Sequence, residues 1–120
     1  YGDQHYDGES RAVILAGGPG VGPAVAIAER AVGDGGEAAI VYRDAAPAHE
    51  PRLSALRETG VDVALLDADE SLDGPVAAAV TGADTEGVFV YGFADFVEDA
   101  TAAIERGGGD PDAAKVENFG

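Results

Sequence analysis

Four glycines stand close together in the segment GGPGVGP at residues 17–23, between an apolar run and a stretch with helical periodicity. Positions without side chains let a phosphate approach the backbone, and the first amides of a following helix add donors and about half a positive charge from the helix dipole. The segment therefore predicts a phosphate site at its four glycines, Gly17, Gly18, Gly20 and Gly22. No Lys-Ser/Thr pair follows, so the segment is not a Walker loop, and a tight turn without a ligand would also use glycines.

The elements around this segment alternate between strands and helices. Continuous apolar runs predict strands at 12–16, 38–43, 61–68 and 87–92, with a last short strand at 114–119. Apolar stripes and their flanking glycines and prolines predict helices at 23–32, 51–59, 74–80 and 94–106. Such alternation implies crossover units, and hence an α/β fold with a five-stranded parallel sheet.

The ends of the predicted strands indicate where a ligand should bind. Open parallel sheets bind ligands beyond the carboxyl ends of their strands, near the point where the strand order reverses. We therefore expect the site among the loops that leave the first four strands, at 17–22, 43–50, 67–73 and 92–95.

The chain is strongly acidic. Its 120 residues include 23 acidic and 7 basic side chains, for a net charge of −16, and Lys115 is the single lysine. Nucleic acids and anionic membranes are held mainly by Lys and Arg, so we expect neither as a partner. Molar salt shortens the Debye length to about 3 Å and would relieve the self-repulsion of such a surface. This favours a salt-adapted organism; an ordinary acidic protein from a low-salt cell is the alternative.

The remaining side chains offer little further chemistry. The chain has no cysteine, which excludes disulfides, thiolate metal sites and cysteine nucleophiles. His5 and His49 have no partner at metal-ligand spacing, and the acids at 67–73 fit a solvated surface better than a cation site, so we expect no metal. Apolar runs are far shorter than the roughly 20 residues of a membrane helix and no signal peptide is evident, which predicts a cytoplasmic domain.

The start of the chain is typical of a linker. Residues 1–10 carry acids and turn-forming residues with no apolar periodicity, and the chain contains no methionine. We therefore expect a piece of a longer protein, in which 1–10 is a linker and 11–120 is the domain.

Three segments together carry a family resemblance. AGGPGVGP at 16–23 resembles the AGG-T-GI-AP segment that opens the nicotinamide-nucleotide domain of the ferredoxin–NADP reductase-like flavoproteins. Family members continue with a strand ending in Cys-Gly-Pro and close on a strand reading Glu-x-Phe-Gly, to which VFVYGF at 88–93 and ENFG at 117–120 are similar. IVYR at 40–43 resembles the family's second strand, whose terminal arginine commonly faces the adenosine ribose or its phosphate.

The resemblance implies a three-layer, Rossmann-like domain that binds NAD or NADP, preceded by a separate domain that binds FAD or FMN. Arg43 would contact the adenosine end, and the pyrophosphate would be held by Gly17, Gly18, Gly20, Val21 and Gly22. The residues expected near the nicotinamide and the flavin are Gly92, Phe93 and Phe119, which would bind the cofactors, and Tyr91 and Glu117, which would be catalytic. A hydride would pass between nicotinamide and flavin, and the flavin would pass single electrons to a carrier such as a ferredoxin. No segment resembles the family's flavin motif, so this domain alone should be inactive.

Three departures from the family pattern alter these expectations. Pro19 stands where the family often has threonine, which removes a hydroxyl and a backbone donor. Tyr91 and Phe93 replace the family's cysteine and proline, so the nicotinamide pocket should have bulkier walls. A non-catalytic interaction or regulatory module that keeps the fold is therefore the alternative function.

The site residues also have purely structural interpretations. Arg43 beside Asp44 would form a surface ion pair worth under about 1 kcal/mol. Glu117 would solvate an edge strand, while Tyr91 and Phe119 would pack into the core. Arg43 would favour the 2′-phosphate of NADPH and Asp44 would oppose it, which leaves both nucleotides open.

Overall fold

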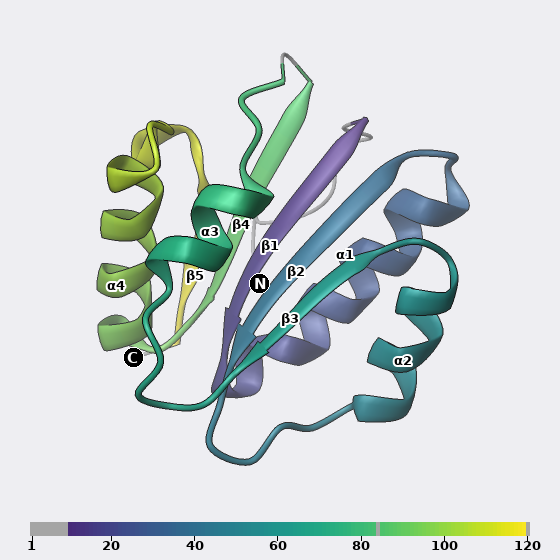
Figure 1. Ribbon diagram of the computed structural model, residues 1–120, viewed down its shortest axis with the longest axis horizontal. Helices are drawn as coiled ribbons and strands as arrows, with labels where there is room; N and C mark the ends of the chain where they lie inside the picture. Colours follow the sequence, from purple (N-terminus) through teal and green to yellow (C-terminus); the bar gives the residue numbers. More distant parts are fainter. Residues whose placement is uncertain (1–9, 84, 120) are drawn as a thin grey trace.

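The structure is a computed structural model that describes residues 10–83 and 85–119 (Figure 1). Its strands are β1 (Arg11–Gly17), β2 (Glu37–Arg43), β3 (Asp62–Leu66), β4 (Glu86–Gly92) and β5 (Lys115–Asn118). Its helices are α1 (Val21–Gly33), α2 (Glu50–Glu58), α3 (Asp73–Ala79) and α4 (Ala94–Arg106), with two short 3₁₀ turns, η1 (Gly18–Gly20) and η2 (Pro111–Ala113). Most of the predicted linker, with His5, lies outside the described residues, as does the last glycine of ENFG.

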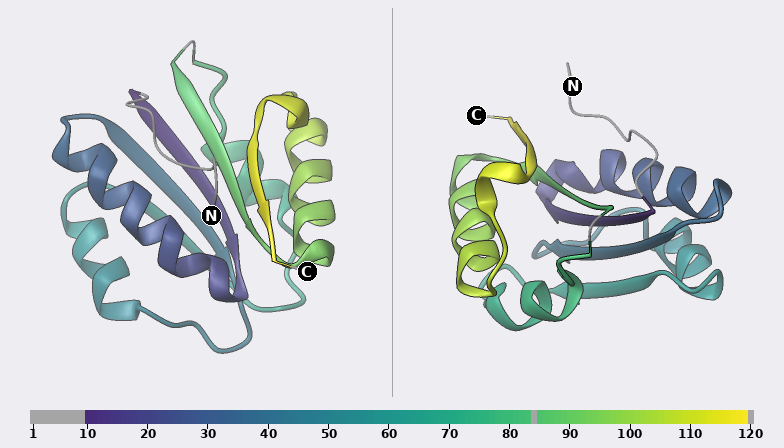
Figure 2. Two further views of the ribbon diagram at one scale, coloured as in Figure 1. Left: turned by 180° about the vertical axis from the view of Figure 1, so that it is seen from behind. Right: turned by 90° about the horizontal axis from the view of Figure 1, so that it is seen from above.

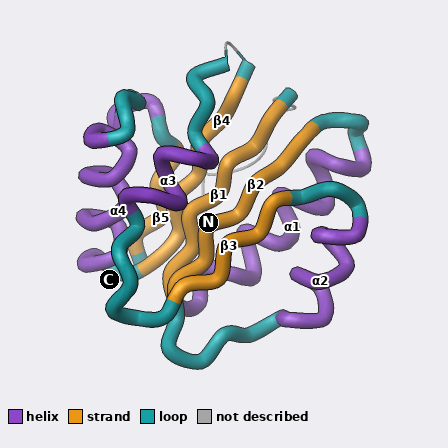
Figure 3. Tube along the Cα trace, in the orientation of Figure 1, coloured by secondary structure: helices purple, strands orange, loops and turns teal. Residues whose placement is uncertain are grey.

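All five strands form one parallel sheet, in the order β3-β2-β1-β4-β5 (Figure 3). The chain builds outward from β1 to β3, then returns past β1 to add β4 and β5. The strand order therefore reverses between β1 and β4, whose carboxyl ends lie at the lower edge of the sheet in Figure 1. Helices α1 and α2 cover one face and α3 and α4 the other (Figure 2), which confirms the predicted three-layer α/β fold.

The core consists of two layers because successive side chains of a strand point to opposite faces. Ile14 of β1 packs in the layer with α1 and α2, and its neighbour Leu15 packs in the layer with α3 and α4. Both faces of the central strands are thus buried, and their sequences are apolar throughout rather than alternating. Among the described residues, no polar or charged residue is buried as a whole, but the side chain of Glu86 is only 3% exposed.

The observed boundaries differ from the predicted ones mainly in the glycine segment. Helix α1 begins at Val21, two residues before the predicted start at Pro23. Proline fits the first turn of a helix because its missing amide hydrogen would have no partner there. Gly18–Gly20 forms a single 3₁₀ turn, so the segment predicted as a loop is partly helical.

A charged network lies at the amino edge of the sheet, where the strands begin, opposite the edge formed by their carboxyl ends. The carboxylate of Glu86 accepts hydrogen bonds from the Thr81 hydroxyl (2.6 Å), the Gly82 amide (3.1 Å) and the Arg11 guanidinium (3.1 Å). Burial alone would raise the pKa of Glu86, but these hydrogen bonds together hold it below its ordinary value of 4.5. The network fixes the turn that precedes β4.

Candidate functional site

The turn between β1 and α1 presents backbone groups at the strand-order reversal. Gly18 has a φ of +53°, a conformation that favours glycine, and no side chain caps the start of η1 or α1. Pro19 and Pro23 have no amide hydrogen, and the Val21 amide donates to the carbonyl of Gly18. Donors for a phosphate at this turn must therefore come mainly from glycine amides, at the positive end of the α1 dipole.

The glycines of the turn fall into two groups. A Cβ on Gly20 would lie 2.2 Å from the carbonyl oxygen of Tyr91, so η1 rests directly on the end of β4. A Cβ on Gly18 or Gly22 would meet nothing within 4 Å. Gly20 is thus required by packing, whereas Gly18 and Gly22 face open space that a ligand could occupy.

Phe96 of α4 lies over the ends of β1 and β4. A Cβ on Gly17 would be 2.5 Å from Cγ of Phe96, and a Cβ on Gly92 would be 2.7 Å from its Cδ2. The absence of side chains at Gly17 and Gly92 is therefore explained by the aromatic ring. Phe96 lies on the apolar stripe of the helix predicted at 94–106, and its position four residues after the strand-ending Gly92 was the available signal for this contact.

Arg43, at the end of β2, is held by three contacts. Its guanidinium carbon lies 5.5 Å from the centre of the Phe96 ring, Nη2 donates to Asp99 of α4 (2.8 Å), and Nη1 donates to the carbonyl oxygen of Glu70 (3.2 Å). The predicted pairing with Asp44 is wrong, because strand pleating directs Arg43 toward α4. Asp44 instead accepts the amide of Ala46 within its own loop (3.1 Å).

Tyr91 and Glu117 are neighbours in register on β4 and β5. Tyr91 is 1% exposed, and burial, followed by the negative charge of Glu117, raises its pKa to about 12. Its ring therefore belongs to the core, as the structural interpretation predicted, and a catalytic role for either side chain stays a prediction.

Two aromatic residues form an apolar spot at the ends of β4 and β5. Phe93 is 53% exposed, and its ring meets that of Phe119 edge-on, with centroids 6.1 Å apart. The Phe119 amide donates to the carbonyl of Gly92 (2.9 Å), which extends the strand pairing past Asn118. Phe119 also packs against the core layer of α1 and α2, so its predicted core role is confirmed, and it remains partly accessible beside Phe93.

The structure thus brings most predicted site residues to one place. The glycine turn contacts the end of β4, Phe96 joins the ends of β1 and β4, and Arg43 reaches the same aromatic ring from β2. The 67–73 loop contributes the Glu70 carbonyl rather than a cluster of metal-binding acids. No group of three or more metal-ligating side chains occurs among residues 10–83 and 85–119, and no helix in that part of the chain is long and apolar enough to cross a membrane.

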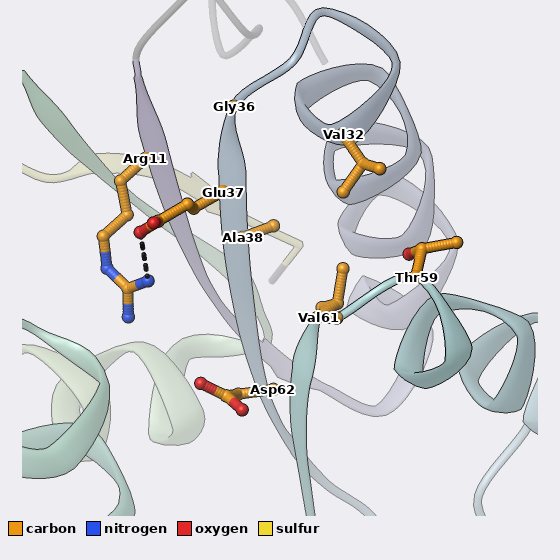
Figure 4. A pocket seen from close by; sticks show the side chains of 9 residues that line it. Arg11, Val32, Gly36, Glu37, Ala38, Thr59, Val61 and Asp62 are labelled. Carbon is orange, nitrogen blue, oxygen red and sulfur yellow. Dashed lines mark hydrogen bonds and ion pairs between the residues drawn. The ribbon is translucent and has the colours of Figure 1, made fainter.

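A pocket of about 250 Å³ lies away from this site, at the amino edge of β2 and β3 (Figure 4). Arg11 and Glu37 point toward each other and are joined by a hydrogen bond of 3.3 Å, and Asp62 and Thr59 also line the pocket. Gly36 and Gly60 also line it, but both follow the C-terminal ends of helices, α1 and α2, where the helix dipole disfavours a phosphate.

Comparison with known proteins supports the fold assignment. The chain matches a cytochrome P450 reductase from Amycolatopsis over 99% of its own length, with a TM-score of 0.76 and 22% identity. It matches a flavohemoglobin from Malassezia yamatoensis, solved with bound FAD and heme, over 98% (TM-score 0.69, 19% identity). It also matches the flavohem-like FAD/NAD binding domain of a nitric oxide dioxygenase from Vibrio cholerae over 100% (TM-score 0.67, 14% identity).

These likenesses define the fold of the chain and its extent. The chain covers 42%, 33% and 56% of the three solved chains, so it spans about a third to just over half of each. No protein-family model matches it, and no curated protein sequence does. The chain therefore has the fold of the NAD(P)-binding domain of ferredoxin reductase-like flavoproteins.

Proposed function

We propose that this chain binds a nicotinamide dinucleotide at the carboxyl edge of its sheet, as the NAD(P)-binding domain of a flavin-dependent oxidoreductase. One observation carries the proposal: at the reversal between β1 and β4, the glycine turn and the YGF segment are in direct contact through Gly20 and Tyr91. A dinucleotide that crosses a sheet at such a point needs a phosphate site and a flat site for its reacting ring side by side.

The residues present fit a dinucleotide. Its pyrophosphate would lie on the open side of the turn, beside Gly18 and Gly22, where the α1 dipole favours negative charge. The adenosine would extend over the end of β2 toward Arg43, and the nicotinamide would lie along Gly92 toward Phe93. Bulky groups lie next to the nicotinamide position, since Phe96 packs against Gly92 and the adjacent Phe93 is exposed.

The flavin, FAD or FMN, would belong to a separate domain of the longer protein, and when bound it supplies hydride acceptance and single-electron release. Exposed Phe93 and its neighbour Phe119 are the groups of this chain that would contact that domain, because exposed aromatic pairs favour burial against a partner. A ferredoxin or another electron carrier would accept or supply the electrons. The acidic composition supports a salt-adapted organism and a cytoplasmic location.

The test is a titration of the chain with NADH, NADPH and ADP-ribose in molar salt, followed by heteronuclear NMR so that millimolar binding is visible. We expect shift changes at 17–22, 43–50 and 91–95, and a weaker response to ADP-ribose at 91–95 because it lacks the nicotinamide. No shift at saturating concentrations of all three ligands would reject nucleotide binding and favour the alternative of an interaction module.

A further inference from the structure

Arg43 is the basic residue placed to meet a phosphate at the adenosine end, and the fold already occupies it. Its guanidinium stacks on Phe96 and is bonded to Asp99 (2.8 Å) and to the carbonyl of Glu70 (3.2 Å), which leaves the Arg43 side chain 15% exposed. These partners come from α4 and from the loop after β3, so they fix the guanidinium from two sides. A ligand phosphate that needs Arg43 must therefore displace Asp99 or bind beside its negative charge.

The loops around Arg43 also disfavour a ligand phosphate, because most of their charged residues are acidic. The four loops at the carboxyl edge, 17–22, 43–50, 67–73 and 92–95, contain a single Arg or Lys, which is Arg43 itself. The same loops contain seven acidic residues, of which Asp73 is itself paired with Arg106 at the end of α4 (2.6 Å). The other six are Asp44, Glu50, Asp67, Asp69, Glu70 and Asp95. With Arg43 neutralised by Asp99, the edge carries a negative field that repels additional ligand charge.

NADH and NADPH differ at this end of the molecule. NADPH carries a 2′-phosphate on its adenosine ribose, which adds up to two negative charges, whereas NADH carries a neutral hydroxyl that donates hydrogen bonds to carboxylates. We propose that Asp99 is a specificity-determining residue, which by pairing with Arg43 makes this chain prefer NADH over NADPH. This inference rests on the proposed dinucleotide site, and it names the nucleotide that the site selects.

Asp99→Asn tests the proposal. Asp99 is exposed on the surface of α4, and asparagine keeps its shape while removing its charge, so the variant should fold. We expect the wild-type chain to bind NADH more tightly than NADPH, and the variant to raise the NADPH-to-NADH affinity ratio about tenfold, equivalent to about 1.4 kcal/mol. The dissociation constants are measured by calorimetry at moderate ionic strength, where exposed charges still interact, and NMR spectra confirm the fold of each variant.

Two further variants distinguish the effect of the Arg43–Asp99 pair from the effect of the overall negative charge at this edge of the sheet. Glu98→Gln removes one negative charge from the neighbouring exposed position of the same helix and should leave the ratio unchanged. Adding Arg43→Gln to Asp99→Asn should cancel the gain for NADPH, because the released guanidinium is what binds the phosphate.

The outcomes distinguish the two proposals. Binding of NADH with an unchanged ratio in Asp99→Asn, or an equal change in Glu98→Gln, would overturn the role of Asp99 while leaving the dinucleotide site intact. If the wild-type chain bound neither nucleotide, the proposed function would be rejected and this inference with it.

Discussion

Replacing Gly20 with alanine should destabilise this domain, although alanine is the better helix former. The added Cβ would lie 2.2 Å from the carbonyl oxygen of Tyr91 and 2.7 Å from its carbonyl carbon. Backbone atoms of a central strand cannot turn aside as a flexible side chain can, so η1 must move away from β4. Overpacking of this kind costs about 1–3 kcal/mol. For a domain of this size we expect the melting temperature to fall by about 4–12 °C.

Gly22→Ala is the matched control, because its Cβ would meet nothing within 4 Å and the residue is already helical. Alanine there should stabilise the fold by up to about 1 kcal/mol. If a phosphate approaches Gly22, the same variant should weaken NADH binding at least about tenfold, since the methyl group occupies the approach. Thermal unfolding and an NADH titration of both variants measure the two effects. Equal melting temperatures for Gly20→Ala and Gly22→Ala would refute the packing argument, and unaltered NADH affinity in Gly22→Ala would refute the ligand-facing role of Gly22.

Three further predictions concern charge and pH. Glu86→Gln should lower the free energy of unfolding by about 2 kcal/mol at neutral pH. Because the folded-state pKa of Glu86 lies below 4.5, the stabilisation by its carboxylate is present above that pH and is lost in acid. The free energies of unfolding of wild type and variant, measured in urea, should therefore converge as the pH falls. Tyr91→Phe should leave NADH affinity unchanged and reduce the loss of stability that develops in the wild type as the pH rises from 10 toward about 12. Part of that loss should remain, because burial also raises the pKa of Tyr42, and a variant as sensitive as the wild type would contradict the assignment. Because the chain carries a net charge of −16, its melting temperature should rise as the KCl concentration increases from about 0.1 M to 1 M, over which the Debye length falls from about 10 Å to 3 Å. A melting temperature that does not change with salt would count against salt adaptation.

Much of the candidate site was predictable because its signals are local. A glycine turn between an apolar strand and an amphipathic helix is recognisable from adjacent residues, and all four candidate loops do leave the carboxyl ends of parallel strands. The resemblance also placed the YGF segment correctly at the end of β4. The partner of Arg43 was not predictable, since Asp99 lies 56 residues away and nothing in the sequence distinguishes it from the other exposed acids.

The sequence by itself determined the alternation of strands and helices, because a strand buried on both faces must be apolar throughout and a helix buried on one side must repeat its apolar residues every three to four positions. Only the tertiary structure decided that Gly20 rests on Tyr91, that one phenylalanine ring accounts for both Gly17 and Gly92, and that Asp99 holds Arg43. Periodicity depends on near neighbours along the chain, whereas these contacts depend on the order in which the strands assemble. That order places β1 between β2 and β4, and so brings the ends of three separate segments to one edge.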